Sequence, residues 1–354
     1  MKSQPRSRAL VPTLIVATLL ALAFIVFRRA EVHAESAPSL KNVAKTGVKH
    51  GTLVWFEGSC DASGAVPIDA RRFLLADDED NVLRVYDAEL GGRPLFETDL
   101  SPELGLMGKN RGLESDIEGA TRVDDTAYFL TSHGRKSDGR YDPNRLLFFG
   151  TSLPAEGTKL ALVGRPYRTL LDDMLRQPAL RELGLAEAAR RAPKDPGGLN
   201  LEGLGHAPDG SLLLGFRNPV PKGRAVIVRL SNPRAVLMGK APELSAPVYL
   251  DLGGLGIRAL SYFRGSHLIA AGSSGNGGQG RLYRWDGGST VAPLEVRAAG
   301  FGPLNPEAFF TPEERREFLV LSDDGTQSIG GVPCKHLKDA KAKRFRGMWI
   351  RPEL

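Results

Sequence analysis

Five short stretches decide the fold of this chain: Asp61-Ala-Ser-Gly-Ala, Asp116-Ile-Glu-Gly-Ala, Asn200-Leu-Glu-Gly-Leu, Gly256-Ile-Arg-Ala-Leu and Asn305-Pro-Glu-Ala-Phe. Each copy places a charged residue before small residues and an apolar run. The charged residues are Asp61, Glu118, Glu202, Arg258 and Glu307. Successive copies are about 50 to 85 residues apart, which is the size of a propeller blade. The five copies therefore predict five equivalent structural units.

Strand-like apolar runs recur at matching positions after these copies. The first run after each copy ends in polar residues about 15 positions beyond the charged one. These ends are Asp77-Asp78, Ser132-His133, Arg217-Asn218, Ser273-Ser274 and Asp323-Asp324. Further apolar runs follow, separated by turn residues. Short strands with regular turns predict an all-β protein, a single β-propeller of five four-stranded antiparallel blades.

Two intervals of the chain bear on ring closure and blade number. The last repeat lacks a fourth strand, and Gly51-Thr-Leu-Val-Trp-Phe has the matching pattern, so we expect the N-terminal strand to close the ring. The interval between Glu118 and Glu202 is the longest, and six blades are the alternative if it conceals another blade. Leu170, Leu171, Met174 and Leu175 recur there at helical spacing, which predicts a small helical insertion at about 165–195, either packed on the ring or acting as a lid.

The N-terminus has the pattern of a membrane-targeting segment. Three basic residues precede an apolar run at 9–27, and Val32-His33-Ala34 suits a signal peptidase. Residues 1–34 are predicted to be a transmembrane anchor or a cleaved signal peptide, 35–50 a tether and 51–354 the propeller. Either reading exports the propeller to a bacterial envelope, on the periplasmic side, with the membrane contacted only through the N-terminal helix.

Charge and composition limit the classes of partner. The net charge of +6 is spread among acidic residues, and no basic stripe interleaved with aromatic residues is present, so we expect no nucleic-acid partner. We expect a monomer that binds a small anionic ligand or an envelope protein.

The charged motif residues form the first candidate site. The first strand of each propeller blade lines the central channel, so the carboxylates of Asp61, Glu118, Glu202 and Glu307 are expected to converge there beside Arg258. Several carboxylates with backbone and water oxygens suit Ca²⁺ or another divalent cation. The alternative is that each carboxylate accepts backbone amide hydrogen bonds and pins neighbouring blades together.

The polar strand ends form an outer set on the same face, expected to bind an anionic ligand beside the cation. Its members are Asp77, Asp78, Asp80, Arg135, Arg217, Asp323 and Asp324, together with Arg258 of the inner set. His133 is the candidate catalytic acid or base, because histidine titrates near neutral pH. The alternatives are a histidine satisfied by structural hydrogen bonds and aspartates that cap turns.

Cys60 and Cys334 are the two cysteines of the chain. Cys60 adjoins the first motif, and Cys334 lies in a connection of the fifth repeat. A closed ring makes these neighbouring positions on one face. We therefore predict a disulfide, which an oxidising compartment would preserve.

Several ordered strings carry a resemblance to a known family. They are Cys60-Asp-Ala-Ser-Gly-Ala-Val, Ala76-Asp-Asp-Glu-Asp-Asn-Val-Leu-Arg-Val-Tyr, Asp116-Ile-Glu-Gly-Ala, Thr131-Ser-His-Gly-Arg, Asn200-Leu-Glu-Gly-Leu, Gly215-Phe-Arg-Asn-Pro and Ser322-Asp-Asp-Gly-Thr. In these strings the chain, from about Gly51 onward, resembles a bacterial family catalogued as domain of unknown function 3616. The resemblance implies a propeller of no established activity. The Glu-Gly blade starts are more loosely similar to exported phytase-like propellers, an analogy of fold that transfers no catalytic residue.

Two functions follow as hypotheses. The first is a propeller that binds a small or anionic ligand with a divalent cation at the motif face, as a hydrolase of phosphate esters or other esters. The second is a non-catalytic envelope scaffold that uses the ring for protein contacts.

Overall fold

The computed structural model describes residues 51–108, 113–153, 160–275, 277, 280–288, 292–296 and 304–351. The predicted anchor or signal peptide at 1–34 and the tether at 35–50 lie outside these residues. No helix in the described part of the chain is both long and apolar enough to cross a membrane. The described residues lie in the compact unit that starts at Gly47.

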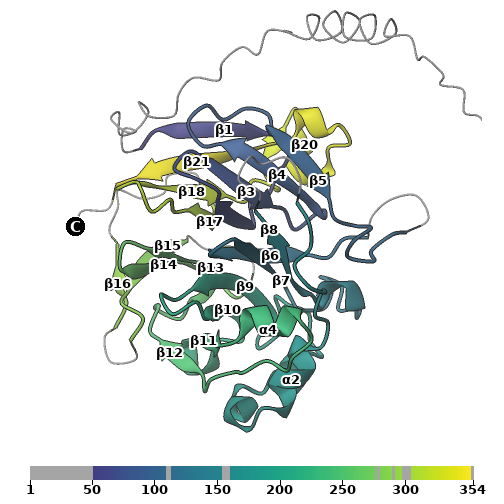
Figure 1. Ribbon diagram of the computed structural model, residues 1–354, viewed down its shortest axis with the longest axis vertical. Helices are drawn as coiled ribbons and strands as arrows, with labels where there is room; N and C mark the ends of the chain where they lie inside the picture. Colours follow the sequence, from purple (N-terminus) through teal and green to yellow (C-terminus); the bar gives the residue numbers. More distant parts are fainter. Residues whose placement is uncertain are drawn as a thin grey trace, which may run out of the picture. The chain divides into compact units, whose positions relative to one another are not determined.

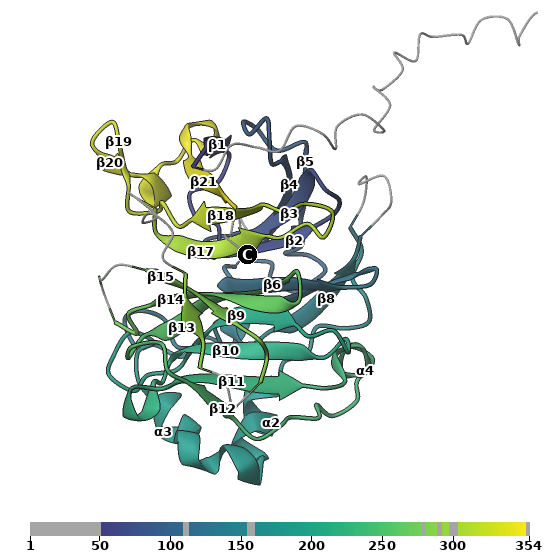
Figure 2. The same ribbon diagram turned by 90° about the vertical axis from the view of Figure 1, so that its left-hand side faces the viewer.

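This unit is an all-β propeller of five blades (Figures 1 and 2). Blade 1 contains β2 (Gly64–Pro67), β3 (Arg72–Ala76), β4 (Val82–Asp87) and β5 (Phe96–Asp99). Blade 2 contains β6 (Ile117–Val123), β7 (Thr126–Thr131) and β8 (Phe148–Ser152). Blade 3 contains β9 (Asn200–His206), β10 (Leu212–Asn218), β11 (Ala225–Leu230) and β12 (Val248–Leu250). Blade 4 contains β13 (Gly256–Phe263), β14 (Ser266–Gly272), β15 (Arg281–Trp285) and β16 (Leu294–Glu295).

Blade 5 combines the two ends of the propeller. It contains β17 (Pro306–Phe310), β18 (Phe318–Ser322), β21 (Arg344–Ile350) and, as its outer strand, β1 (Leu53–Glu57). β1 pairs antiparallel with β21 from Leu53 opposite Met348 to Glu57 opposite Arg344. The predicted closure of the ring by the N-terminal strand is therefore confirmed. A small hairpin, β19 (Ser328–Ile329) and β20 (Val332–Pro333), lies between β18 and β21.

The long interval after blade 2 holds helices, so the six-blade alternative is wrong. It contains α2 (Leu170–Arg176), the 3-10 helix η3 (Pro178–Leu183) and α3 (Leu185–Ala188), and a further helix, α4 (Pro233–Leu237), precedes β12. Pro178 separates α2 from η3 because its ring cannot continue the preceding helix. Four-stranded blades are predicted, but blade 2 has three strands within the described residues, and Leu162 forms only an isolated bridge with Thr151 there.

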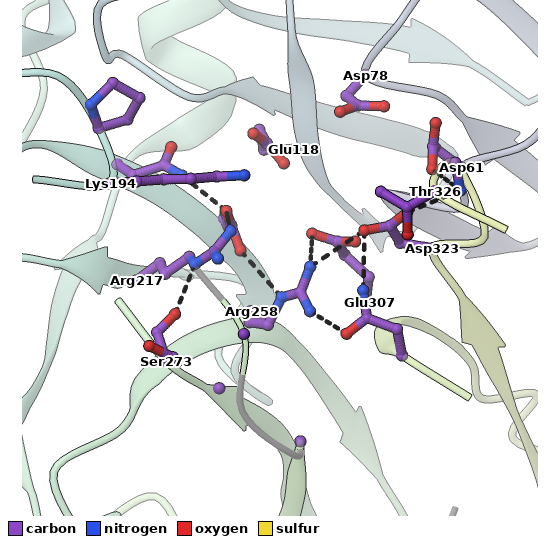
Figure 3. Close-up of a pocket in the computed structure, with 18 of the residues that line it drawn as sticks. Asp61, Asp78, Glu118, Lys194, Arg217, Arg258, Ser273, Glu307, Asp323 and Thr326 are labelled. Atoms are coloured by element: carbon purple, nitrogen blue, oxygen red, sulfur yellow. Dashed lines mark hydrogen bonds and ion pairs between the residues drawn. The ribbon is translucent and has the colours of Figure 1, made fainter. Parts of the chain in front are cut away.

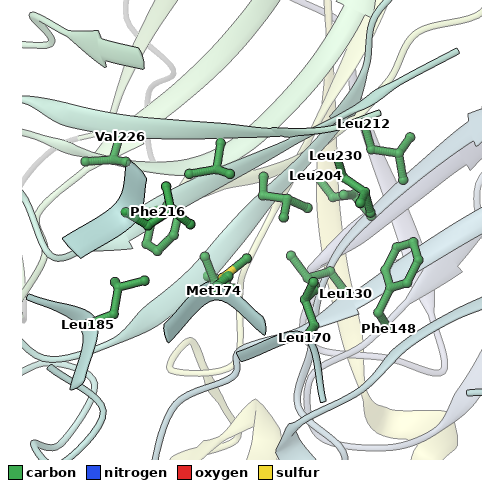
Figure 4. Close-up of a cluster of buried hydrophobic side chains, with 14 of the residues drawn as sticks. Leu130, Phe148, Leu170, Met174, Leu185, Leu204, Leu212, Phe216, Val226 and Leu230 are labelled. Carbon is green, nitrogen blue, oxygen red and sulfur yellow. The ribbon is translucent and has the colours of Figure 1, made fainter. Parts of the chain in front are cut away.

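The apolar face of the insertion belongs to the core. Leu170, Met174 and Leu185 are buried in one cluster with Phe216 and Val226 of blade 3 (Figure 4). Burying a leucine or methionine side chain of this kind contributes about 2 kcal/mol. The insertion is therefore packed on the ring, and its apolar stripe does not serve a lid.

A β-bulge recurs in the inner strands of blades 2 to 5. The pairing of each inner strand with the second strand skips one residue of the inner strand, which is Glu118, Glu202, Arg258 or Glu307. In blade 3 the pairing also skips Arg217 of β10. A bulge inserts one extra residue and turns its side chain out of the regular alternation. The charged motif residues therefore project together from the ends of four inner strands.

The glycine after the glutamate lets neighbouring inner strands approach closely. A Cβ atom on Gly119 would lie 2.8 Å from the carbonyl oxygen of Glu202, and one on Gly203 would lie 2.6 Å from the Cγ2 atom of Ile257. Both distances are shorter than side chains tolerate. The Glu-Gly pair thus combines a projecting carboxylate with the close approach of two blades.

Candidate functional site

A cavity of about 1380 Å³ lies where the inner strands present these residues. Acidic side chains outnumber basic ones in its lining. The acidic residues are Asp61, Asp78, Glu79, Glu114, Asp116, Glu118, Glu202, Glu295, Glu307 and Asp323, and the basic residues are Arg145, Lys194, Arg217, Arg258, Arg281 and Lys335. The four motif carboxylates and Arg258 are therefore brought to one cavity, as the sequence predicts.

Arg258 forms ion pairs with its two neighbours on the ring, Glu202 and Glu307 (Figure 3). Its Nη2 atom lies 2.6 Å from Oε1 of Glu307, and its Nε atom lies 3.6 Å from Oε2 of Glu202. Its Nη1 atom donates to the side chain of Asn305. All four of these residues are buried or nearly so, so the charge of Arg258 acts with little screening by water.

Arg217 binds the other side of Glu202. Its Nη1 donates to Glu202 Oε1 at 2.6 Å, and its Nε and Nη2 donate to the carbonyl oxygens of Ser273 and Gly275 at 2.9 and 3.0 Å. The guanidinium group has a partner at each of its three nitrogens. Arg217 therefore acts chiefly to fix Glu202 and the connection after β14.

Glu118 differs from Glu202 and Glu307 because no ion pair joins it to Arg258 or to another basic residue in the described part of the chain. Its side chain is 7% exposed, and within the described residues no donor or basic group pairs with it (Figure 3). Burial, and then the nearby charges of Glu202, Asp116 and Asp78, raise the pKa of Glu118 well above its usual value. A buried carboxylate without a partner is costly and calls for a proton or a cation.

Three carboxylates can meet at one cation. Oxygen atoms of Glu118, Glu202 and Glu307 all lie within 4.8 Å of one another, and all three side chains are buried. Glu202 Oε2 is buried without a hydrogen bond. Burial, opposed by Arg258, raises the pKa of Glu307 to about 8. The donor set is all oxygen, which is the set that a hard divalent cation prefers.

Asp61 occupies a different position from the one expected. By register, Gly64 lies beside Gly119 and Ala120, so Ser63, and not Asp61, stands where Glu118 stands in blade 2. Asp61 Oδ1 accepts the amide hydrogen of Gly325 at 2.8 Å. Burial and then Asp323 raise the pKa of Asp61 to about 12. Asp61 thus lines the cavity and contacts blade 5 through the amide of Gly325.

Asp323 is the second carboxyl group at that contact, and its pKa shifts in the opposite direction. Burial opposes ionisation, but hydrogen bonds with Asp61, the charge of Arg258 and the amide of Gly325 together lower the pKa of Asp323. Its Oδ2 accepts from Asn305 Nδ2 at 2.9 Å. The pair of carboxyl groups therefore joins blade 5 to blade 1 across the closure of the ring.

The disulfide lies at the same closure. Cys60 and Cys334 are joined, with their Cα atoms 5.8 Å apart, as the topology predicts. The bond connects the segment before β2 with the connection that follows β20. It encloses most of the ring in one covalent loop.

Asp116 and its partners were missed by the sequence reasoning. Asp116 Oδ2 lies 2.8 Å from Arg145 Nη1, and Arg145 also binds Glu114. Burial, opposed by Arg145, raises the pKa of Asp116 to about 6. The signal was present, because Asp116, Asn200 and Asn305 each stand two residues before a motif glutamate.

Lys194 is a second cation that the sequence did not reveal. It follows α3 and lines the cavity, and within the described part of the chain no ion pair joins it. The flanking backbone is held by Asn218 Nδ2, which donates to the carbonyl oxygens of Pro193 and Asp195 at 2.9 and 2.7 Å. Lys194 therefore presents an ammonium group to the cavity from a fixed segment.

His133 does not line the cavity. Its imidazole is buried, and Nδ1 donates to the carbonyl oxygen of Thr131 at 2.8 Å. Burial lowers the pKa of His133 to about 4. These contacts agree with the alternative interpretation, in which structural hydrogen bonds satisfy His133.

Other members of the outer set also bind elsewhere. Arg135 donates to the carbonyl oxygen of Ala189 at 2.9 Å and so holds the insertion. Asp324 pairs with Arg346 at 2.6 Å, and Asp80 pairs with Arg84 at 2.6 Å. Asp77 is buried and accepts from Ser59, and none of these side chains lines the cavity. Of the outer set, Asp78, Asp323 and Arg217 line the cavity, beside the inner set of motif residues.

Solved structures that match this chain are distant. The glutaminyl cyclase of Myxococcus xanthus matches at 12% identity and a TM-score of 0.44, covering 86% of this chain and 97% of that one. The PQQ-bound aldose sugar dehydrogenase of Streptomyces coelicolor matches at 13% identity and a TM-score of 0.40, covering 86% and 100%. An exo-β-1,3-galactanase of Phanerochaete chrysosporium matches at 8% identity and a TM-score of 0.46, covering 85% and 63%.

The sequence itself matches one family model. No curated protein matches the chain. The matching residues, 169–301, contain the helical insertion and blades 3 and 4. The resemblance stated from the sequence is therefore confirmed over that part of the chain, which matches the family described as "Protein of unknown function (DUF3616)".

Proposed function

We propose that the cavity binds a divalent cation, with Glu118, Glu202 and Glu307 as its protein ligands, and a small anionic ligand beside it. The unpaired Glu118 carboxylate is the observation that carries this proposal. A carboxylate that only pinned neighbouring blades would accept hydrogen bonds from them, and Glu118 accepts none from the described residues. A cation of two charges would lower the cost of keeping three carboxylates in one buried place.

The anionic ligand follows from the basic side chains at the cavity. Lys194 has no ion-pair partner among the described residues, and Lys335 lies 3.7 Å from Glu79, which is a loose contact. A ligand oxyanion held by a cation and an ammonium group is the arrangement used in metal-assisted hydrolysis of phosphate esters and other esters. Such hydrolysis is the reaction to test first. The proposal gives His133 no part in it, because His133 does not line the cavity.

The test is a calorimetric titration of Ca²⁺ into the full chain in detergent, with Glu118→Gln and Glu202→Gln as variants. We expect each variant to weaken binding at least about 10-fold, because each loses a charged oxygen ligand. Asp125→Asn is the matched control, since Asp125 lies in the exposed turn between β6 and β7. Undetectable binding by the unmodified chain, or unchanged affinity in both variants, would reject the proposal and favour the scaffold interpretation. A panel of phosphate esters and carboxylic esters with and without Ca²⁺ then tests turnover.

A further inference from the structure

Two of the three carboxylate sets among the described residues of the cavity share Glu118, and the third contains Asp61, Asp78 and Glu79. Glu118, Glu202 and Glu307 form the first set, and Asp78, Asp116 and Glu118 form the second. In each set the oxygen atoms lie within 4.8 Å of one another. A carboxylate has two oxygens and can bind one cation with each of them. Glu118 is therefore placed to belong to two cation positions at once.

We infer that the cavity holds two divalent cations bridged by the Glu118 carboxylate, with Asp78 and Asp116 as the other protein ligands of the second cation. This inference rests on the proposed function and extends it. It assigns to the site a second ion and, through that ion, a class of ligand.

Unpartnered oxygen atoms support the second position independently of the clustering. The Glu118 side chain is only 7% exposed and has no partner within the described residues. Asp78 Oδ1 is also buried without a hydrogen bond. A single cation at the first set would leave the Asp78 oxygen without a partner. A second cation beside Glu118 would bind it, which removes the cost of burying a bare polar atom.

The charge balance points the same way. Arg145 is the basic residue paired with the second set, through Asp116, and it also binds Glu114. No ion pair joins Asp78 to a basic side chain in the described part of the chain. The three carboxylates of the second set have one arginine between them, and Arg145 is also shared with Glu114. The second set therefore carries an excess of negative charge. A divalent cation is the partner of matching charge.

Two neighbouring cations define the class of ligand. Paired divalent ions bind two oxygens of one tetrahedral oxyanion and stabilise charge on both of them. Lys194 lines the same cavity and can contact a third oxygen. The arrangement is suited to a phosphate group, and inorganic phosphate is the probe for it.

The experiment measures cation stoichiometry and coupling in the full chain. Mn²⁺ is added stepwise and followed by equilibrium dialysis and electron paramagnetic resonance. We expect two equivalents to bind, with the second equivalent replacing the hyperfine pattern of an isolated ion by that of an exchange-coupled pair. Phosphate is expected to tighten the binding of the second equivalent at least about 10-fold, because it bridges both ions.

The variants separate the two positions. Asp78→Asn is expected to bind one equivalent and to keep the isolated-ion spectrum, whereas the control Asp80→Asn, whose side chain pairs with Arg84, is expected to bind two. One equivalent in the unmodified chain, or two in Asp78→Asn, overturns this inference and leaves the proposed function standing. No bound equivalent in the unmodified chain overturns both. The stoichiometry of the unmodified chain therefore tests the inference even where a variant fails to fold.

Discussion

Replacing Glu118 by glutamine should stabilise the cation-free protein while weakening its cation binding. The native Glu118 carboxyl is buried without a partner in the described structure, and burial raises its pKa well above the ordinary value of 4.5. A carboxyl whose pKa is raised on folding binds more protons in the native state than in the unfolded state. The Glu118 carboxyl therefore lowers the free energy of unfolding as pH rises above its ordinary pKa. Below that pH this loss of stability is absent.

The size of the effect follows from the same linkage. Each pH unit above the ordinary pKa costs about 1.4 kcal/mol until the native group ionises. At about pH 7.5 the penalty reaches at most about 4 kcal/mol. Glutamine keeps the shape of the side chain and carries no charge. We therefore expect Glu118→Gln to raise the free energy of unfolding by about 1 to 4 kcal/mol without cations.

Urea unfolding is measured once with a chelator and once with excess Ca²⁺. The first measurement tests the gain in stability, and the second tests the loss of cation binding. Ca²⁺ at about 100 times its Kd should stabilise the unmodified protein by about 2.7 kcal/mol, and it should stabilise Glu118→Gln by much less. Glu202→Gln is the comparison, because Glu202 accepts from Asn200 at 2.7 Å and from Arg217 at 2.6 Å. Losing that paired charge should destabilise the protein by about 3 kcal/mol. A comparable destabilisation in Glu118→Gln would refute the reasoning and identify Glu118 as a structural pin.

Three further predictions concern the fold. Urea titrations at several pH values should show that His133→Asn loses less stability than the parent between pH 6.5 and about 4, by up to about 3 kcal/mol. The buried native imidazole has a pKa of about 4 and so binds fewer protons in this range than the unfolded one. An unchanged loss of stability on acidification contradicts this prediction. Replacing both Cys60 and Cys334 by serine should lower the unfolding free energy by about 2 to 5 kcal/mol, since the disulfide spans 274 residues, and equal stability to the oxidised parent contradicts it. Gly119→Ala should cost about 1 to 3 kcal/mol and weaken Ca²⁺ binding, because its Cβ would lie 2.8 Å from the carbonyl oxygen of Glu202; unaltered melting and affinity contradict it.

The blade architecture could be predicted from sequence because its signal is repeated and regular. Apolar runs separated by turns and the matching run at Gly51 were enough to give five blades and the strand that closes them. The number of blades depended on reading Leu170 and Met174 as helical, and the structure buries both in the core.

The candidate site was predicted less completely, because bulges are invisible to strand periodicity. One extra residue in β6, β9, β13 and β17 decides which side chain faces the cavity. Aligning the copies on their acidic residue matched Asp61 with Glu118. Aligning them on the Asp or Asn two positions earlier matches Ser63 with Glu118, as the structure does. Contacts such as that between Asp116 and Arg145 join separate loops of the blade and have no local pattern.

The closure of blade 5 also has a mechanical consequence. A pulling force applied on the N-terminal side of Gly51 reaches the propeller through β1, which is held to β21 by backbone hydrogen bonds. Those bonds can be pulled apart from Gly51 onward, but the covalent link from Cys60 to Cys334 transfers the load to the connection before β21. Extension under force should therefore stop at Cys60 in an oxidising medium and continue into blade 1 after reduction. β1, the outer strand of blade 5, is therefore a segment that force can detach, and the disulfide limits how far the chain extends.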